Sequence, residues 1–109
     1  MAIPHAAPGE AIDVRPLGDR LPREKTVALF KAKDLEVMRL VLQAGKSLPP
    51  HKVAGEITIQ CIEGAIDVTA GGTSHLLRAG QLLFLSAHVV HAVSALEDAS
   101  ALVTVVLAR

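Results

Sequence analysis

Turn-forming residues interrupt this chain so often that they leave little room for a long helix. The turn glycines are Gly45, Gly64, Gly71, Gly72 and Gly80, and the stretches between them are short and mostly apolar. Glycine adopts the positive backbone angle φ that tight turns require. Short apolar segments bounded by turn residues are typical of β-strands. The spacing therefore predicts an all-β fold, either a sandwich or a barrel of about eight strands.

The strand pattern is clearest in residues 57–62. There Ile57, Ile59 and Cys61 alternate with Thr58, Gln60 and Ile62, which is the period of a strand with two different faces. The other predicted strands cover residues 26–31, 35–43, 65–69, 73–78, 82–85, 89–95 and 102–107. A helix over residues 26–42 is the main alternative, because Lys, Leu and Glu are good helix formers. Pro49 and Pro50 predict a stiff loop after Gly45.

The chain is expected to form one domain preceded by an irregular arm. A length of 109 residues suits a single hydrophobic core. Residues 1–23 contain Pro4, Pro8, Pro16 and Pro22, and this spacing predicts that no helix of any length forms there. We therefore expect a proline-rich arm over residues 1–23 and one barrel domain over residues 24–109.

Charge and composition argue against several classes of partner. Lys plus Arg (11) balances Asp plus Glu (11), so the net charge of zero disfavours nucleic acid and electrostatic membrane attachment. Phe30 and Phe84 are the only Phe, Tyr or Trp side chains, too few to stack bases. No stretch approaches the ~18 apolar residues that span a bilayer, and residues 1–9 do not resemble a signal peptide. Because the single Cys61 cannot form an internal disulfide, we expect a cytoplasmic protein.

Two stretches carry candidate functional residues at a recognisable spacing. The first begins at Gly45, passes His51 and ends at Gly64, and the second runs from Gly80 to His91. Together they resemble the two conserved motifs of the cupin family. In the first of those motifs a glycine precedes two histidines and then an acidic or amide ligand. In the second, another glycine precedes a further histidine.

The departures from the family pattern concern the metal ligands. His51 and His91 occupy two of the family's histidine positions, whereas Val53 stands at the third. Ile57 or Thr58 stands where the family usually has the acidic or amide ligand. The resemblance therefore predicts the family scaffold with a partly dismantled metal site.

The resemblance also implies a fold and a cofactor. The implied fold is an RmlC-like jelly-roll β-barrel, also called a double-stranded β-helix, with His51 and His91 close together inside its mouth. The implied cofactor is one divalent transition metal (Zn, Fe, Ni or Mn) held by these two histidines, with no bound metal as the alternative. Divalent sites normally need three or four protein donors, so two histidines alone would bind weakly.

Three further residues could complete such a site. His88 stands in the second motif where the family usually has glycine, Glu56 precedes the usual ligand position, and Cys61 shares a strand face with Ile57 and Ile59. Each also has a purely structural interpretation. His88 would be a surface loop residue and Glu56 a solvated charge, while Cys61 would be a small buried hydrophobe.

The leading functional hypothesis is a small binding protein whose barrel cavity holds a small-molecule ligand or a metal. Val53, Ile57, Ile59 and Phe84 are expected to line this cavity, with the two histidines as its polar groups. The alternative is a metal-dependent cupin enzyme of the dioxygenase, decarboxylase or isomerase type, acting on a small organic substrate. A metal-free reaction with a histidine base would lack the usual tyrosine, because the chain has no Tyr. A sensor domain of a transcription regulator would need a DNA-binding helix pair that is not recognisable here.

A homodimer is also expected. The arm over residues 1–23 has too few apolar residues for a core of its own and needs a surface to lie on. The resemblance implies barrels paired through one sheet, and two-fold pairing is the commonest closed symmetry of soluble oligomers.

Overall fold

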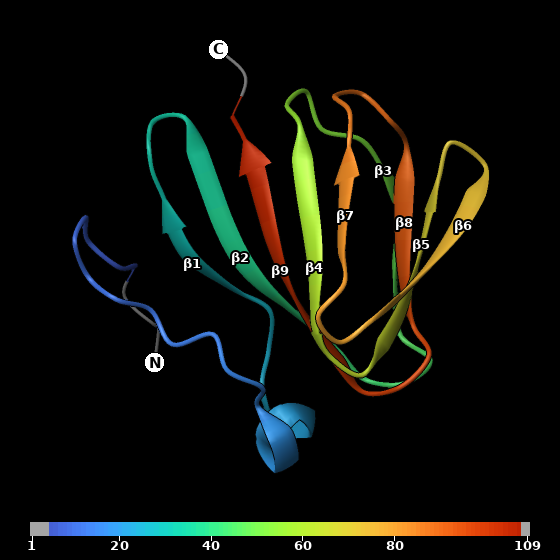
Figure 1. Cartoon of the computed structure of the whole chain (residues 1–109), viewed down its shortest axis with the longest axis horizontal. Coiled ribbons are helices and arrows are strands. Elements are labelled where there is room, and N and C mark those ends of the chain that lie inside the picture. The colour runs from blue at the N-terminus through green and yellow to red at the C-terminus, as the bar shows by residue number, and fades with distance from the viewer. Residues whose placement is uncertain (1–4, 108–109) are drawn as a thin grey trace.

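The computed structural model describes residues 5–107 as two antiparallel sheets and one short helix. The strands are β1 Val27–Lys31, β2 Leu35–Leu42, β3 Ser47–His51, β4 Ile57–Glu63, β5 Ala65–Ala70, β6 Thr73–Arg78, β7 Leu82–Leu85, β8 His91–Ala95 and β9 Ala99–Val106. One sheet has the order β1-β2-β9-β4-β7 and the other β3-β8-β5-β6, a jelly-roll barrel (Figure 1). The strands converge at the lower end of Figure 1 and spread toward its upper end. The predicted all-β fold is confirmed.

The helix alternative for residues 26–42 is wrong. This segment forms the antiparallel pair of β1 and β2, with an irregularity between Ala28 and Phe30. Strand β2 is in turn paired along its whole length with β9. The good helix formers in this segment are overridden because a strand here buries alternate side chains against the barrel core.

The predicted loop after Gly45 is also partly wrong, because Ser47–His51 forms β3. Strand β3 lies at the edge of its sheet and pairs only with β8. Its register shifts between Leu48 and His51, where Pro49 and Pro50 have no N–H to donate. Prolines are tolerated at such an edge position, since no further strand needs their missing donors.

The barrel core follows from the alternation along each strand. In β4, Ile57, Ile59 and Cys61 are buried, whereas Thr58 and Gln60 on the opposite face are half-buried. The same alternation on the facing strands produces one continuous aliphatic cluster. Its members include Leu42, Ile66, Val68, Leu77, Leu85, Val93, Ala95, Ala99 and Ala101.

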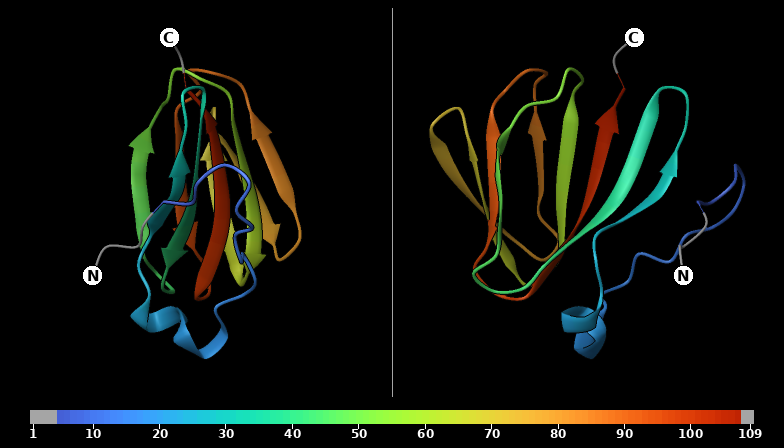
Figure 2. Two further views of the ribbon diagram at one scale, coloured as in Figure 1. Left: turned by 90° about the vertical axis from the view of Figure 1, so that its left-hand side faces the viewer. Right: turned by 180° about the vertical axis from the view of Figure 1, so that it is seen from behind.

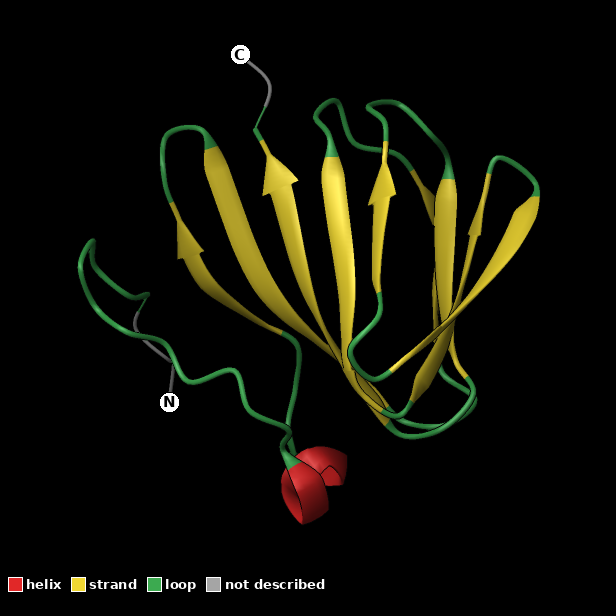
Figure 3. Cartoon of the chain, viewed as in Figure 1, coloured by secondary structure: helices red, strands yellow, loops and turns green. Residues whose placement is uncertain are grey.

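The described part of the arm contains a 3₁₀ helix over Gly18–Arg23, so the prediction of no helix there is wrong (Figure 3). The helix is short enough to accommodate Pro22, and it buries Leu21. Figures 1 and 2 place the arm beside β1, where the Ala6 N–H donates to the Leu29 carbonyl at 2.9 Å. The arm therefore lies on its own barrel.

Two side chains of the barrel hold the arm in place. The Glu63 carboxylate accepts hydrogen bonds from the backbone N–H groups of Leu17 (2.8 Å) and Gly18 (3.0 Å). The buried Arg39 guanidinium donates to the Arg15 carbonyl at 2.8 Å. Both side chains thus satisfy backbone groups of an otherwise irregular segment.

Within residues 5–107, no helix has the length and hydropathy that crossing a membrane would require.

Candidate ligand-binding cavity

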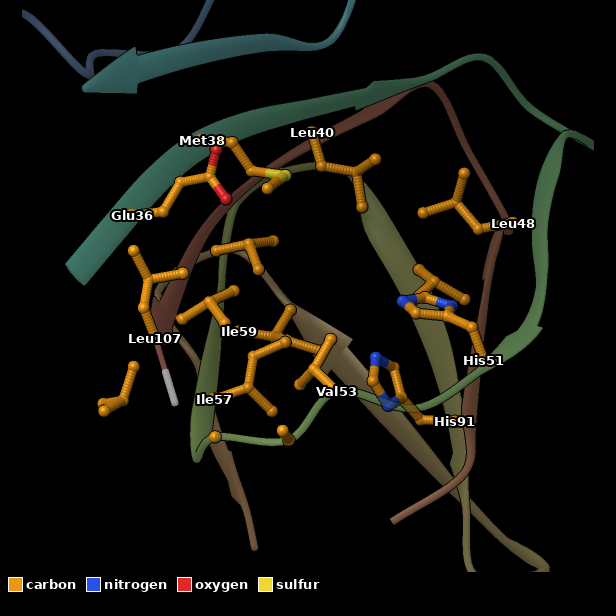
Figure 4. Close-up of a pocket in the computed structure, with 16 residues that line it drawn as sticks. Glu36, Met38, Leu40, Leu48, His51, Val53, Ile57, Ile59, His91 and Leu107 are labelled. Carbon is orange, nitrogen blue, oxygen red and sulfur yellow. The ribbon is translucent and has the colours of Figure 1, made fainter. Parts of the chain in front are cut away.

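A cavity of about 390 Å³ opens at the end of the barrel where the strands spread apart (Figure 4). Its walls are mainly aliphatic and come from both sheets. The lining residues are Glu36, Met38, Leu40, Leu48, His51, Val53, Ala54, Gly55, Ile57, Ile59, His91, Val93, Val103, Val105, Val106 and Leu107. Three of these side chains, Glu36 and the two histidines, carry polar or charged groups. The cavity is therefore an apolar site with a few polar groups, the usual form of a small-molecule pocket.

The two histidines come from neighbouring strands. His51 is the last residue of β3 and His91 the first of β8, and the two are paired directly across the sheet. Their ring centroids are 4.4 Å apart with the planes tilted by 55°. His91 is 3 % exposed, whereas His51 is exposed at the mouth. Figure 4 shows both rings projecting into the cavity.

Backbone carbonyls determine which ring nitrogen of each histidine carries the proton. The Nδ1 of His51 lies 3.2 Å from the Pro49 carbonyl oxygen, and the Nδ1 of His91 lies 3.1 Å from that of Val89. A carbonyl oxygen only accepts, so each Nδ1 must be the protonated nitrogen that donates. In the neutral form each Nε2 is then left as an acceptor, and the cavity receives two such acceptors side by side.

Glu36 is a cavity residue that sequence reasoning did not predict. In β2 it alternates with Val37, so it shares the inner face with Met38 and Leu40. Figure 4 shows Glu36 on the side of the cavity away from His51 and His91. Within residues 5–107 its carboxylate forms no ion pair. Period-two counting along β2 would have revealed this position.

The predicted lining residues divide into two groups. Val53, Ile57 and Ile59 line the cavity as expected. Phe84 does not, and its assignment to the cavity is wrong: it is 57 % exposed on the outer face of β7, opposite Thr58 of β4. The reason is the strand alternation, because Leu85 takes the buried face.

The three extra donor candidates lie outside the cavity lining. His88 and Glu56 are exposed. His88 has a φ of 68°, the left-handed region in which glycine is usual, and its N–H donates to the Val53 carbonyl at 2.8 Å. The loops before β4 and after β7 are thereby joined at the mouth of the barrel.

Cys61 lies in the closed part of the core. It is fully buried, and its thiol donates to the Glu63 carbonyl at 3.4 Å. Burial raises the pKa of the Cys61 thiol. The neutral thiol is therefore favoured over the thiolate that a soft metal would need.

The histidines and acidic side chains of the described barrel do not form a complete donor set for a divalent metal. Among residues 5–107, no three His, Cys, Asp or Glu side chains gather closely enough to hold an ion. The cavity offers His51 and His91 as adjacent donors, fewer than the three or four that divalent sites normally use. The residues present thus do not supply the complete metal site that the family resemblance implies.

Comparison with known proteins identifies a family. Residues 38–107 match the cupin domain. A comparison with curated proteins gives no match.

Solved structures share the fold at low sequence identity. A conserved protein of unknown function from Streptococcus pyogenes has a TM-score of 0.77 and 20% identity, covering 100% of this chain and 96% of its own. An RmlC-like cupin from Desulfovibrio desulfuricans has a TM-score of 0.74 and 22% identity, covering 89% and 96%. KdgF from Halomonas sp. has a TM-score of 0.69 and 22% identity, covering 77% and 78%.

Proposed function

The chain belongs to the cupin family, and from this premise we propose that it binds a small organic molecule in the barrel cavity. One observation carries the proposal: an aliphatic cavity of about 390 Å³ has the paired histidines His51 and His91 projecting into it. The volume lies within the range of typical ligand pockets, roughly 300–1,000 Å³.

The chemistry of the walls defines the roles of the residues. Leu40, Ile57 and Ile59 would cover the apolar body of the ligand, and removing apolar surface from water contributes about 25 cal/mol for each Å². The Nε2 atoms of His51 and His91 would orient a polar group of the ligand. Fixed acceptors of this kind provide orientation and specificity more than affinity.

A titration with a neutral aliphatic probe tests this proposal. Cyclohexanol, which has an apolar body and one hydroxyl group, is added to methyl-labelled protein, and the NMR signals of Ile57 and Ile59 are followed. We expect saturable shifts that are lost in Val53→Trp, which fills the cavity, and kept in Val90→Trp. Val90 is a matched control because it is 51 % exposed and outside the lining. The absence of saturable binding, or equal binding by Val53→Trp, would contradict the proposal.

A second candidate is the metal-dependent enzyme that the family resemblance implies. The observation in its favour is the orientation of the histidines, because metal-binding histidines also donate their other ring N–H to a carbonyl or carboxylate. The incomplete donor set counts against it. We expect protein purified without a His tag to contain well under one equivalent of Zn, Fe, Ni or Mn by elemental analysis. A stoichiometric metal would favour the enzyme.

Cys61 supports a reducing compartment such as the cytoplasm as the working location. Its thiol is buried and hydrogen-bonded, and no second cysteine exists for a disulfide. Proteins of oxidising compartments often rely on disulfides instead.

A further inference from the structure

The polar side chains of the cavity all present hydrogen-bond acceptors to a ligand when the two imidazoles are neutral. His51 and His91 each use their Nδ1–H on a backbone carbonyl, which leaves two Nε2 acceptors. Glu36 adds a carboxylate, which accepts only. No Lys, Arg, Ser, Thr, Asn, Gln, Tyr or Trp belongs to the lining. The side chains of the cavity therefore offer a ligand three acceptors and no free donor.

Two backbone donors at the rim are also in use. The Val106 N–H donates to the Glu56 carbonyl at 2.9 Å, and the Leu107 N–H donates to the Asp34 carbonyl at 2.9 Å. These two rim residues thus have no N–H left for a ligand. A ligand that needs donors, such as a carboxylate or a phosphate, would find none among the neutral side chains of this cavity.

The acceptors are divided between two sides of the cavity. Figure 4 shows Glu36 on one side, the histidines on the other, and the side chains of Met38 and Ile59 between them. Lys31 is the cross-strand partner of Glu36, but it is exposed and the two form no ion pair. A cation on the ligand could therefore pair with the Glu36 carboxylate.

On this basis, and resting on the proposed function, we propose that the natural ligand is an aliphatic amine. Its ammonium group pairs with Glu36, its apolar body covers the aliphatic wall, and a second donor at its other end reaches the Nε2 atoms of His51 and His91. Charge-assisted hydrogen bonds to a carboxylate are about twice as strong as neutral ones, so Glu36 selects for the amine. An anionic ligand of the same length would face the carboxylate without a cation to compensate.

The test compares three probes that have similar carbon chains and different ends. Hexamethylenediamine has ammonium groups, hexanediol has neutral hydroxyl donors, and adipate has carboxylates. Titration calorimetry or methyl NMR at neutral pH should rank them in that order, with the diamine roughly tenfold tighter than adipate. Adipate binding more tightly than the diamine would overturn the proposal.

Variants of Glu36 test the source of this preference. Glu36→Gln should weaken diamine binding roughly threefold to tenfold and leave hexanediol binding nearly unchanged. Glu36→Lys should reverse the ranking in favour of adipate. Glu56→Gln is the matched control, since Glu56 is exposed at the mouth but outside the lining, and it should change nothing. Equal effects of the Glu36→Gln and Glu56→Gln changes would overturn the proposal.

If a Glu36 variant fails to fold, the ranking of the three probes on the unmodified chain still tests whether the ligand is an amine. Failure of this inference is also distinguishable from failure of the proposed function. If cyclohexanol binds in the cavity but the diamine does not bind there, the amine assignment is wrong and the cavity remains a ligand site. If neither probe binds, both are wrong.

Discussion

The carboxylate of Glu63 connects the arm to the barrel, and its ionised form stabilises the folded state. Burial alone would raise the pKa of Glu63, but hydrogen bonds from the Ser100 hydroxyl and from the Leu17 and Gly18 N–H groups, together with the Arg39 charge, lower it below its ordinary value. A carboxylate whose pKa is lower in the folded state stabilises the fold above its unfolded pKa, which is about 4.3 for Glu. This stabilisation is lost as the pH falls through the lower, folded value.

We predict that Glu63→Gln lowers the free energy of unfolding by about 1–2 kcal/mol at neutral pH, since charged hydrogen-bond partners are lost. The variant and the unmodified chain should converge as the pH falls below the lowered pKa of Glu63 in the folded state, because protonation removes the same charge. Urea unfolding at a series of pH values measures this. Glu97→Gln, at an exposed loop position, is the control and should show little loss. A constant difference between Glu63→Gln and the unmodified chain at every pH would contradict the prediction.

Individual functional residues were predictable where a motif placed them. The resemblance to the cupin motifs implied that His51 and His91 lie close together, and their ring centroids do lie 4.4 Å apart. Glu36 was missed and Phe84 misplaced for a single reason. Both assignments depend on which face of a strand points inward, and that requires counting from a known buried residue.

At the scale of elements, the mouth of the cavity depends on a close approach between a loop and a strand end. A Cβ on Gly55 would lie 1.6 Å from the carbonyl oxygen of Val106 in β9. The adjacent hydrogen bond from the Val106 N–H to the Glu56 carbonyl holds the loop in this position. Only glycine fits there, because the obstacle is backbone and cannot rotate away.

We therefore predict that Gly55→Ala destabilises the fold by about 2–4 kcal/mol, as expected of an overpacked site that must move backbone. Gly45→Ala is the matched control. Gly45 has a φ of +84° with open space around it, so an alanine there should cost only about 1–2 kcal/mol of backbone strain. Thermal and urea unfolding measure both changes. Equal losses in the two variants would show that the contact with Val106 is unimportant.

Most strands were predictable from the alternation of apolar and polar residues, and β7 was predicted with its observed bounds, Leu82–Leu85. Strand β3 was not, because Pro49 and Pro50 suggest a loop unless the strand is known to lie at a sheet edge. The 3₁₀ helix was not either, since its short turns tolerate Pro22. Both exceptions depend on tertiary surroundings that local patterns do not contain.

At the scale of the whole molecule, the outer face of β7 is the most exposed apolar surface of the five-stranded sheet. Leu82 is 61 % and Phe84 57 % exposed there. The arm, which was expected to need a partner surface, is instead held by Glu63 and Arg39 of its own chain. The exposed β7 face therefore remains as the basis on which we propose a homodimer.

Size-exclusion chromatography with light scattering should give about twice the monomer mass of 11.4 kDa. Phe84→Glu should shift the protein to a monomer, because a charge would be buried at the contact. Leu96→Glu, at a loop position that is 55 % exposed, should leave the dimer intact. A monomeric unmodified chain at micromolar concentration would refute the homodimer.

The attachment of the arm shows why the arrangement of the whole molecule was harder to predict from the sequence than its strands or its paired histidines. Glu63 binds the backbone of Leu17 across 46 positions of sequence. Glu63 and Gly64 have the local pattern of a turn, and that pattern does not reveal a long-range partner. Hydrophobic periodicity determines which residues are buried within a strand, but not which surface an irregular segment covers.

Two-bond proton–nitrogen NMR spectra of the imidazole rings test the central claim of a ligand cavity with two Nε2 acceptors most directly. On titration with cyclohexanol, the Nε2 signals of His51 and His91 should shift together, with Nδ1 remaining protonated in both rings. His75, which lies on β6 outside the cavity lining, should not respond. Unprotonated Nδ1 atoms, or Nε2 signals that do not change as cyclohexanol is added, would contradict the account.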